Sequence, residues 1–114
     1  MPTERLRPDD AELFRALGDA NRLKILRLLR ERVYCVHMIA EKVGLSQPAA
    51  SQHLRVLRTA GLVHGEKRGF YVHYSLRPEA VHQCAELVTA LAPAKPKRKR
   101  CGVRKTTRRA RIKA

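Results

Sequence analysis

The sequence predicts a mainly α-helical domain with a winged helix-turn-helix fold, in which one β-hairpin forms the wing. Near residues 36–60, a short helix that ends at a glycine is joined by a brief turn to a second, well-capped helix, as in a helix-turn-helix. The next stretch alternates apolar and polar residues, as a hairpin strand does. The chain also carries a net charge of +15, which favours nucleic acid as a partner.

Two further helices are predicted before the helix-turn-helix. Asp9 or Asp10 can cap the first, and Gly18 is free to end it in the left-handed conformation. Asp19 can cap the second. Each has an apolar side, which is made of Leu13, Phe14 and Leu17 in the first and of Ile25, Leu26, Leu28 and Leu29 in the second.

The limits of the helix-turn-helix are predicted from capping residues. Its first helix begins near Cys35 and ends at Gly44, while its second is capped by Ser46, holds Pro48 in its first turn and ends at Gly61. The expected buried residues are Val36, Ile39, Ala40 and Val43 in the first helix and Ala50, Leu54 and Leu57 in the second.

The wing is predicted from two runs, LVHGEK and GFYVHYSL, on either side of a basic turn at Lys67, Arg68 and Gly69. A last helix should start near Pro78. Its apolar residues recur at helical spacing, and so regular a stripe on a terminal helix predicts a partner surface. These residues are Val81, Cys84, Ala85, Val88, Leu91 and Ala92.

The 114 residues divide into a domain, residues 1–92, and a basic tail, residues 93–114. The tail holds 11 of the 25 Lys and Arg residues and no acidic residue, so it is expected to be disordered until it binds a polyanion. Its expected DNA contacts are Lys97, Arg98, Lys99 and Arg100. Without a signal peptide or a long apolar run, the protein is expected to be cytoplasmic, with no membrane partner.

Residues 10–92 resemble the ArsR/SmtB family of bacterial winged-helix repressors, which respond to metals, metalloids or redox signals. The segments that carry the resemblance are LFRALGDANRLKILRLL, CVHMIAEKVGLSQPAASQHLRVLRTAGLV and KRGFYVHYSL. The resemblance implies a homodimer built mainly from the first and last helices. It also implies binding to an imperfect palindrome in double-stranded DNA, with one recognition helix in each half-site.

The recognition helix is the one that starts after Ser46, and its polar side is expected to contact DNA. Gln side chains can bind adenine edges with two hydrogen bonds, Ser is an adaptable donor or acceptor, and Arg suits phosphate or guanine. The expected contacts on this side are Gln47, Pro48, Ser51, Gln52 and Arg55. Lys67 and Arg68 on the wing suit phosphate or the minor groove. The alternative interpretation is a solvated helix face and a solvated turn.

Cys35 and His37 form a candidate pair of metal ligands. In relatives that sense metals, a Cys-x-Cys pair at the start of this helix often binds arsenite or a soft divalent metal, and His37 stands at the second position. Thiolate and imidazole both suit zinc or cadmium, whereas arsenite favours sulfur. In a regular helix, residues two apart point away from each other, so binding would need an extended first turn. Structural roles for both residues are the alternative.

A third ligand is needed, and Cys101 in the tail is the candidate. His82 and Cys84 are the alternative if the last helix lies close to Cys35, but Cys84 lies on the apolar stripe and is expected to pack there. We therefore predict a sequence-specific repressor that zinc, cadmium or arsenite can release from DNA. The alternatives are a redox or persulfide switch using Cys35 and Cys101, a regulator without a signal, and a non-specific architectural protein that coats DNA with its tail. No enzyme is predicted, because Cys35 and His37 lack an orienting third group.

Overall fold

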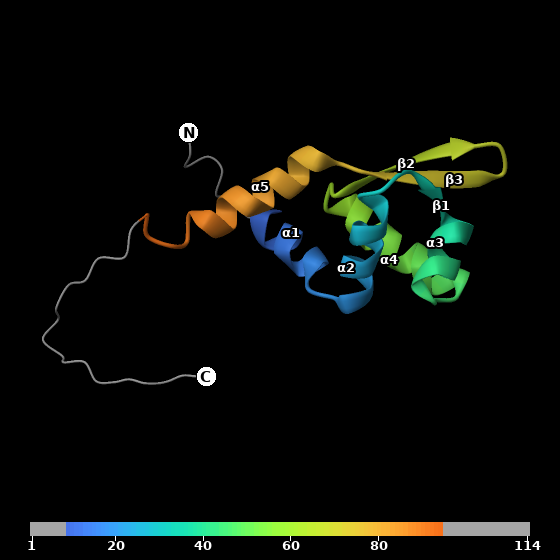
Figure 1. Ribbon diagram of the computed structural model, residues 1–114, viewed down its shortest axis with the longest axis horizontal. Coiled ribbons are helices and arrows are strands. Elements are labelled where there is room, and N and C mark those ends of the chain that lie inside the picture. Colours follow the sequence, from blue (N-terminus) through green and yellow to red (C-terminus); the bar gives the residue numbers. More distant parts are fainter. Residues whose placement is uncertain (1–8, 95–114) are drawn as a thin grey trace, which may run out of the picture.

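The computed structural model describes residues 9–94, and within that range five helices form a bundle from which the hairpin of a three-stranded sheet projects (Figure 1). The helix-turn-helix and the hairpin wing appear in the predicted order, so the predicted fold class is confirmed. The helices are α1 (Asp9–Leu17), α2 (Ala20–Leu29), α3 (Val36–Val43), α4 (Gln47–Thr59) and α5 (Pro78–Thr89). The strands are β1 (Tyr34–Cys35), β2 (Val63–Arg68) and β3 (Tyr71–Leu76).

The helix ends follow the predicted capping residues except in α1, which already includes Asp9 and Asp10, so that neither residue precedes the helix as a cap. The Asp19 carboxylate accepts hydrogen bonds from two backbone N–H groups at the start of α2, and the Ser46 hydroxyl accepts one from Ala49. Gly44 has φ 81° and Gly61 has φ 83°, the left-handed conformation that ends a helix without steric cost. The prediction for Gly18 is wrong, since its φ is not positive.

The reason lies in the short connection between α1 and α2. The last turn of α1 leaves carbonyl groups without a partner in the helix. Nε of Arg22 donates to the Ala16 carbonyl at 2.7 Å, and the Arg15 carbonyl accepts both a terminal nitrogen of Arg22 at 3.3 Å and the Gly18 N–H at 3.2 Å. A left-handed cap at Gly18 is therefore unnecessary.

One apolar core joins the helices to the base of the wing. Helix α2 packs on α3 and α4, and α1 contacts α2, α4 and α5. The largest side chains that are fully buried are Ile25, Ile39, Leu54, Leu57, Leu62 and Val63. Since Leu54 and Leu57 belong to α4, the core fixes the orientation of that helix.

The sheet has the order β1-β3-β2 and is antiparallel throughout. Strand β1 was not predicted, and it pairs Tyr34 with Tyr74 and Cys35 with His73. The predicted turn is wrong by two residues, because Arg68 pairs with Tyr71. The loop of the hairpin is therefore Gly69-Phe70, while Lys67 and Arg68 end β2.

Helix α5 is apolar on two sides, where the sequence analysis predicted one stripe. Ala80, Cys84 and Leu87 face the core and are buried. Val81 and Val88 point outward, with exposed fractions of 39% and 52%. The prediction that Cys84 shares a face with these valines is wrong. Apolar residues at helical spacing do not show which of two adjoining helix faces packs on the core. No helix within residues 9–94 is long and apolar enough to cross a membrane.

Candidate nucleic-acid interface

Helix α4 presents a polar side to solvent and a buried side to the core. Ala50, Leu54 and Leu57 are each 0% exposed, as predicted. The side chains predicted to contact DNA are all exposed, and they are Gln47, Pro48, Ser51, Gln52 and Arg55. They lie in the first three turns of the helix, where a recognition helix meets base edges. The site thus has unpaired polar groups on a helix that cannot easily rotate.

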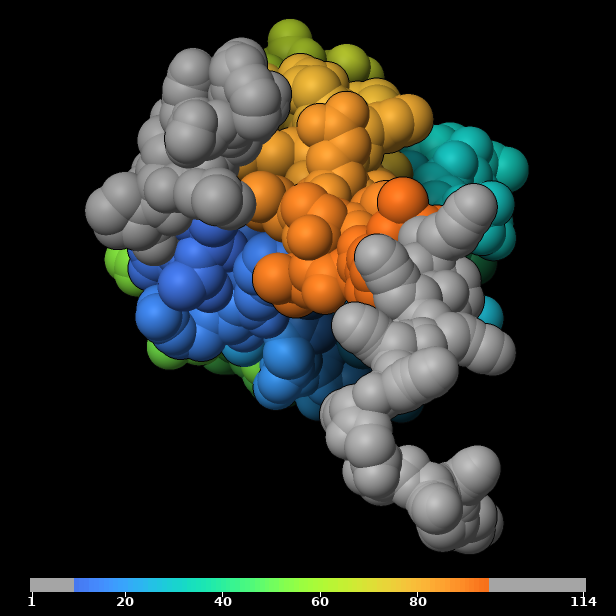
Figure 2. Space-filling model, turned by 90° about the vertical axis from the view of Figure 1, so that its left-hand side faces the viewer, coloured from blue at the N-terminus to red at the C-terminus, as the bar shows by residue number. Residues whose placement is uncertain are grey.

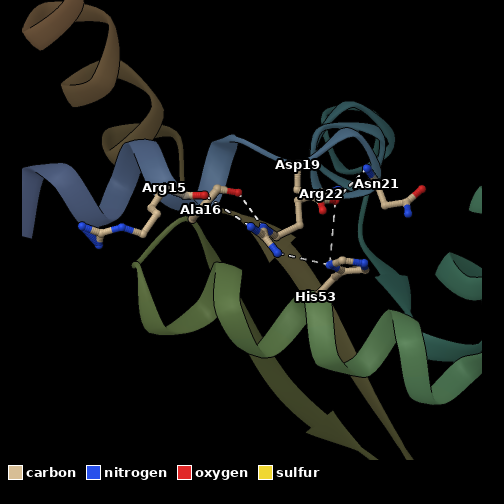
Figure 3. A network of polar contacts seen from close by, with 6 residues as sticks. All are labelled: Arg15, Ala16, Asp19, Asn21, Arg22 and His53. Atoms are coloured by element: carbon tan, nitrogen blue, oxygen red, sulfur yellow. Dashed lines mark hydrogen bonds and ion pairs between the residues drawn. The ribbon is translucent and has the colours of Figure 1, made fainter.

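A polar network holds the back of α4 against the α1–α2 junction (Figure 3). Arg22 lies 3.3 Å from Nδ1 of His53, which belongs to α4. Because a guanidinium can only donate, Nδ1 accepts this bond. The Asp19 carboxylate is 4.0 Å from the same nitrogen. His53 therefore joins α4 to α2 through a hydrogen bond between the two helices.

Asp19 is the charged member of this network. Its carboxylate accepts the backbone N–H groups of Asn21 at 2.8 Å and Arg22 at 3.1 Å. The bond from Arg22 and, to a lesser degree, the bond from Asn21 and the nearby positive charges lower the pKa of Asp19, while partial desolvation opposes them. The anion is thus the favoured form at the positive end of α2.

The wing places Lys67 and Arg68 in the last two pairs of its ladder, both exposed. Arg68 lies 3.4 Å from the Glu66 carboxylate, in a pair whose side chains are more than half exposed. Such a surface pair contributes little and can exchange for another anion. The sequence analysis missed Phe70, which stands in the loop and is 96% exposed. Its place in the two-residue loop is what distinguishes Phe70 from the partly buried residues of β3.

Cys35 stands just before α3 and not within it. Its backbone is extended, with φ −80° and ψ 162°, so the objection based on a regular helix does not apply to this residue. His37 is exposed, and its ring centroid lies 6.4 Å from that of Tyr71. Among residues 9–94, however, no three or more His, Cys, Asp and Glu side chains are grouped so that they could hold a metal ion.

His73 of β3 has a neighbour that the sequence analysis did not predict. It pairs with Cys35 across the sheet, and its Nδ1 is buried with no hydrogen-bond partner in the described structure. The register with β1, which the sequence did not reveal, is what brings these two residues together. Cys101 and the predicted tail contacts Lys97, Arg98, Lys99 and Arg100 lie outside the described residues.

Cys84 is a core residue, as predicted, with 7% of its surface exposed. Burial raises the pKa of the Cys84 thiol, and the negative charge of Asp10 raises it further. Less of the reactive thiolate is therefore present at neutral pH. Among the described cysteines, Cys35 is the more accessible thiol.

Comparison with known proteins gives one consistent family. The family model described as "Bacterial regulatory protein, arsR family" matches residues 19–64. The HTH-type transcriptional repressor SmtB of Mycobacterium tuberculosis is 43% identical over 77 residues, which are 68% of this chain and 55% of that protein. The chain therefore spans about half the length of this relative. The arsenical resistance operon repressor of Escherichia coli is 38% identical over 78 residues, 68% of this chain and 67% of that protein.

A solved structure agrees with these sequences. The homodimeric winged helix-turn-helix DNA-binding domain Mb0332 of Mycobacterium bovis, described as a possible ArsR-family transcriptional regulator, superposes with a TM-score of 0.64. It is 27% identical and covers 74% of this chain and 79% of that one. The fold of this chain is thus similar to that of a solved winged helix-turn-helix domain.

Proposed function

Because the chain belongs to the ArsR family of bacterial regulatory proteins, we propose that it is a transcriptional repressor that binds a palindromic operator in double-stranded DNA as a homodimer. The observation that carries the proposal is the exposed polar side of α4. Buried leucines and the His53 contact hold this helix from behind. Its side chains can therefore reach base edges in the major groove without ordering the helix first.

The homodimer is supported by the outer face of α5. Val81, Ala85 and Val88 lie one helical turn apart on this face, and Leu91 follows at 84% exposure. Figure 2 shows α5 beside α1 on one side of the molecule, and the two helices are in contact. An apolar face of this kind is best covered by the same face of a second copy, which would supply the second recognition helix of a palindrome.

The sequence preference is tested by selection from a pool of randomised DNA duplexes, followed by binding measurements on the selected duplex. We expect Gln52→Ala to lose about tenfold in discrimination at one base pair of each half-site, because a bidentate contact to adenine is removed. Thr59→Ala is the control, since Thr59 is an exposed residue near the end of the same helix. Equal affinity of the native chain for every duplex would favour the architectural alternative instead.

We further propose that a thiophilic ion releases the protein from DNA through Cys35 and His37. The extended backbone at Cys35 and the exposed imidazole of His37 support this proposal, as does the name of the arsenical resistance relative. Cys35 immediately precedes α3, His37 lies in its first turn, and α3 packs on α4. An ion held by both would shift the helix that supports the recognition helix. Cys101 is the proposed third ligand.

Fluorescence anisotropy on the selected duplex, titrated with zinc, cadmium and arsenite, tests this signal. We expect one ion to weaken DNA binding of the native chain by about tenfold or more. Cys35→Ala should abolish the response, whereas Cys84→Ala should keep it, because the Cys84 side chain is buried in the core. DNA binding that no ion changes would eliminate the metal signal. Linkage of Cys35 to Cys101 after mild oxidation would then favour the redox alternative.

A further inference from the structure

The wing ends in an exposed aromatic side chain on a tight turn. Gly69 and Phe70 form the entire loop between the paired residues Arg68 and Tyr71. Gly69 has φ 65°, and Phe70 has no positive φ, as in a type II′ turn with glycine at its first position. Such a turn is short and well defined, so the tip of the hairpin is narrow. We propose that Phe70 inserts as an apolar wedge between base pairs in the minor groove beside the half-site that α4 contacts.

The exposed ring of Phe70 is available to bind a partner. With 96% of its surface exposed, it is the most exposed of the large apolar residues within residues 9–94. The turn itself needs only the glycine, so a polar residue would serve equally well at position 70. The fold therefore leaves an aromatic ring in water at the tip of a hairpin that extends past α3 (Figure 1).

The surroundings of Phe70 fit DNA better than a protein surface. Lys67 and Arg68 come just before the loop, and both are exposed. Lysine and arginine bind the phosphates on either side of a groove, while an aromatic ring can stack on a partly unstacked base step. Glu66, the one acidic residue of the hairpin strands, is paired with Arg68. An apolar wedge next to two cationic side chains is thus suited to a duplex with an opened base step.

The position of the wing relative to α4 permits this contact. The hairpin extends past α3, so its tip lies at the same end of the molecule as the α3–α4 turn (Figure 1). Helix α4 begins at that turn, and its first residues carry the predicted base contacts. The inference rests on the proposed function: when the start of α4 enters the major groove, the wing tip is directed to the neighbouring groove.

The test uses the full chain and the duplex obtained by selection, with 2-aminopurine placed at successive positions flanking the half-site. This base fluoresces more strongly when it is unstacked. We expect binding of the native chain to raise the fluorescence at one flanking step. Phe70→Ala should abolish the rise and weaken binding by about tenfold or more, the usual loss for removing one aromatic ring stacked on a base. The salt dependence of DNA binding by Phe70→Ala should equal that of the native chain, because the substitution removes no charge.

Lys67→Ala is the matched control on the same hairpin. It should keep the fluorescence rise, weaken binding and reduce the salt dependence, because it removes a phosphate contact. Thermal unfolding of Phe70→Ala should match that of the native chain, since the ring is 96% exposed.

Three results would overturn the inference. The first is binding by Phe70→Ala equal to that of the native chain, which leaves the proposed function intact. The second is weaker binding by Phe70→Ala when the native chain produced no fluorescence rise, which would place the ring on the sugar-phosphate backbone. The third is a change in the oligomeric state of Phe70→Ala, which would assign Phe70 to a contact between protein chains. Absence of any preferred duplex for the native chain would instead contradict the proposed function.

Discussion

Val88→Glu is expected to convert the protein to a monomer and to weaken its binding to a palindromic duplex by more than about a hundredfold. Val88 is 52% exposed on the outer face of α5, so the fold of one chain does not depend on it. In a twofold interface the same residue is contributed by both copies. Two carboxylates would be placed close together in an apolar contact, where an unpaired charge is costly. A monomer can occupy only one half-site at a time.

The oligomeric state is measured by sedimentation equilibrium over a range of protein concentrations, and DNA binding is measured on the full palindrome and on one half-site. Thr89→Glu is the control, since Thr89 adjoins Val88 but belongs to the polar side of α5 with His82 and Glu86. It should remain a dimer. A Val88→Glu protein that still dimerises would show that the interface lies elsewhere.

The sequence predicted α4 well because this helix has one buried face and clear ends. Ser46 caps its start, Gly61 follows its end, and the apolar residues at Ala50, Leu54 and Leu57 recur at a single helical period. Its polar residues could then be assigned to the solvent side without knowledge of the rest of the fold. Local chemistry was sufficient because every local preference agreed with the final structure.

The buried face of α5 could not be predicted from residue spacing in the same way. Its apolar residues cover two faces, and one period cannot tell the face that meets the core from the face that meets another chain. Ala80 and Leu87 were missed as core residues, although both are buried. Which face of α5 meets the core depends on its contacts with α1, a helix that is far from α5 in the sequence.

Long-range pairing also explains the errors in the wing and around Cys35. Strand β1 has only two residues and gains its conformation from pairing with β3, so it has no pattern of its own. The position of the hairpin loop is set by the register of the two strands. The sequence therefore placed Lys67 and Arg68 at the tip, where Gly69 and Phe70 stand, and it could not show that Cys35 lies opposite His73.

Leu54→Ala is expected to lower the free energy of unfolding by about 2–5 kcal/mol, the usual cost of truncating a fully buried leucine. Leu54 is 0% exposed and belongs to the core cluster that supports α4. Because a small domain has only about 5–15 kcal/mol in total, this loss is a large share of its stability. Chemical denaturation measures it, at one fixed protein concentration, since dimerisation makes stability depend on concentration.

Val56→Ala provides the comparison on the same helix, because Val56 is 39% exposed and leaves no buried cavity when it is truncated. Val56→Ala should lower the free energy of unfolding by less than about 1 kcal/mol.

The DNA affinity of the folded molecules distinguishes two ways in which Leu54→Ala can weaken DNA binding. If the folded fraction alone falls, the leucine only stabilises the domain. If affinity also falls after correction for the folded fraction, the core sets the orientation of α4. If Leu54→Ala lowered the free energy of unfolding as little as Val56→Ala, the close packing beneath α4 would be contradicted. The assignment of the polar side of α4 to DNA depends on that packing.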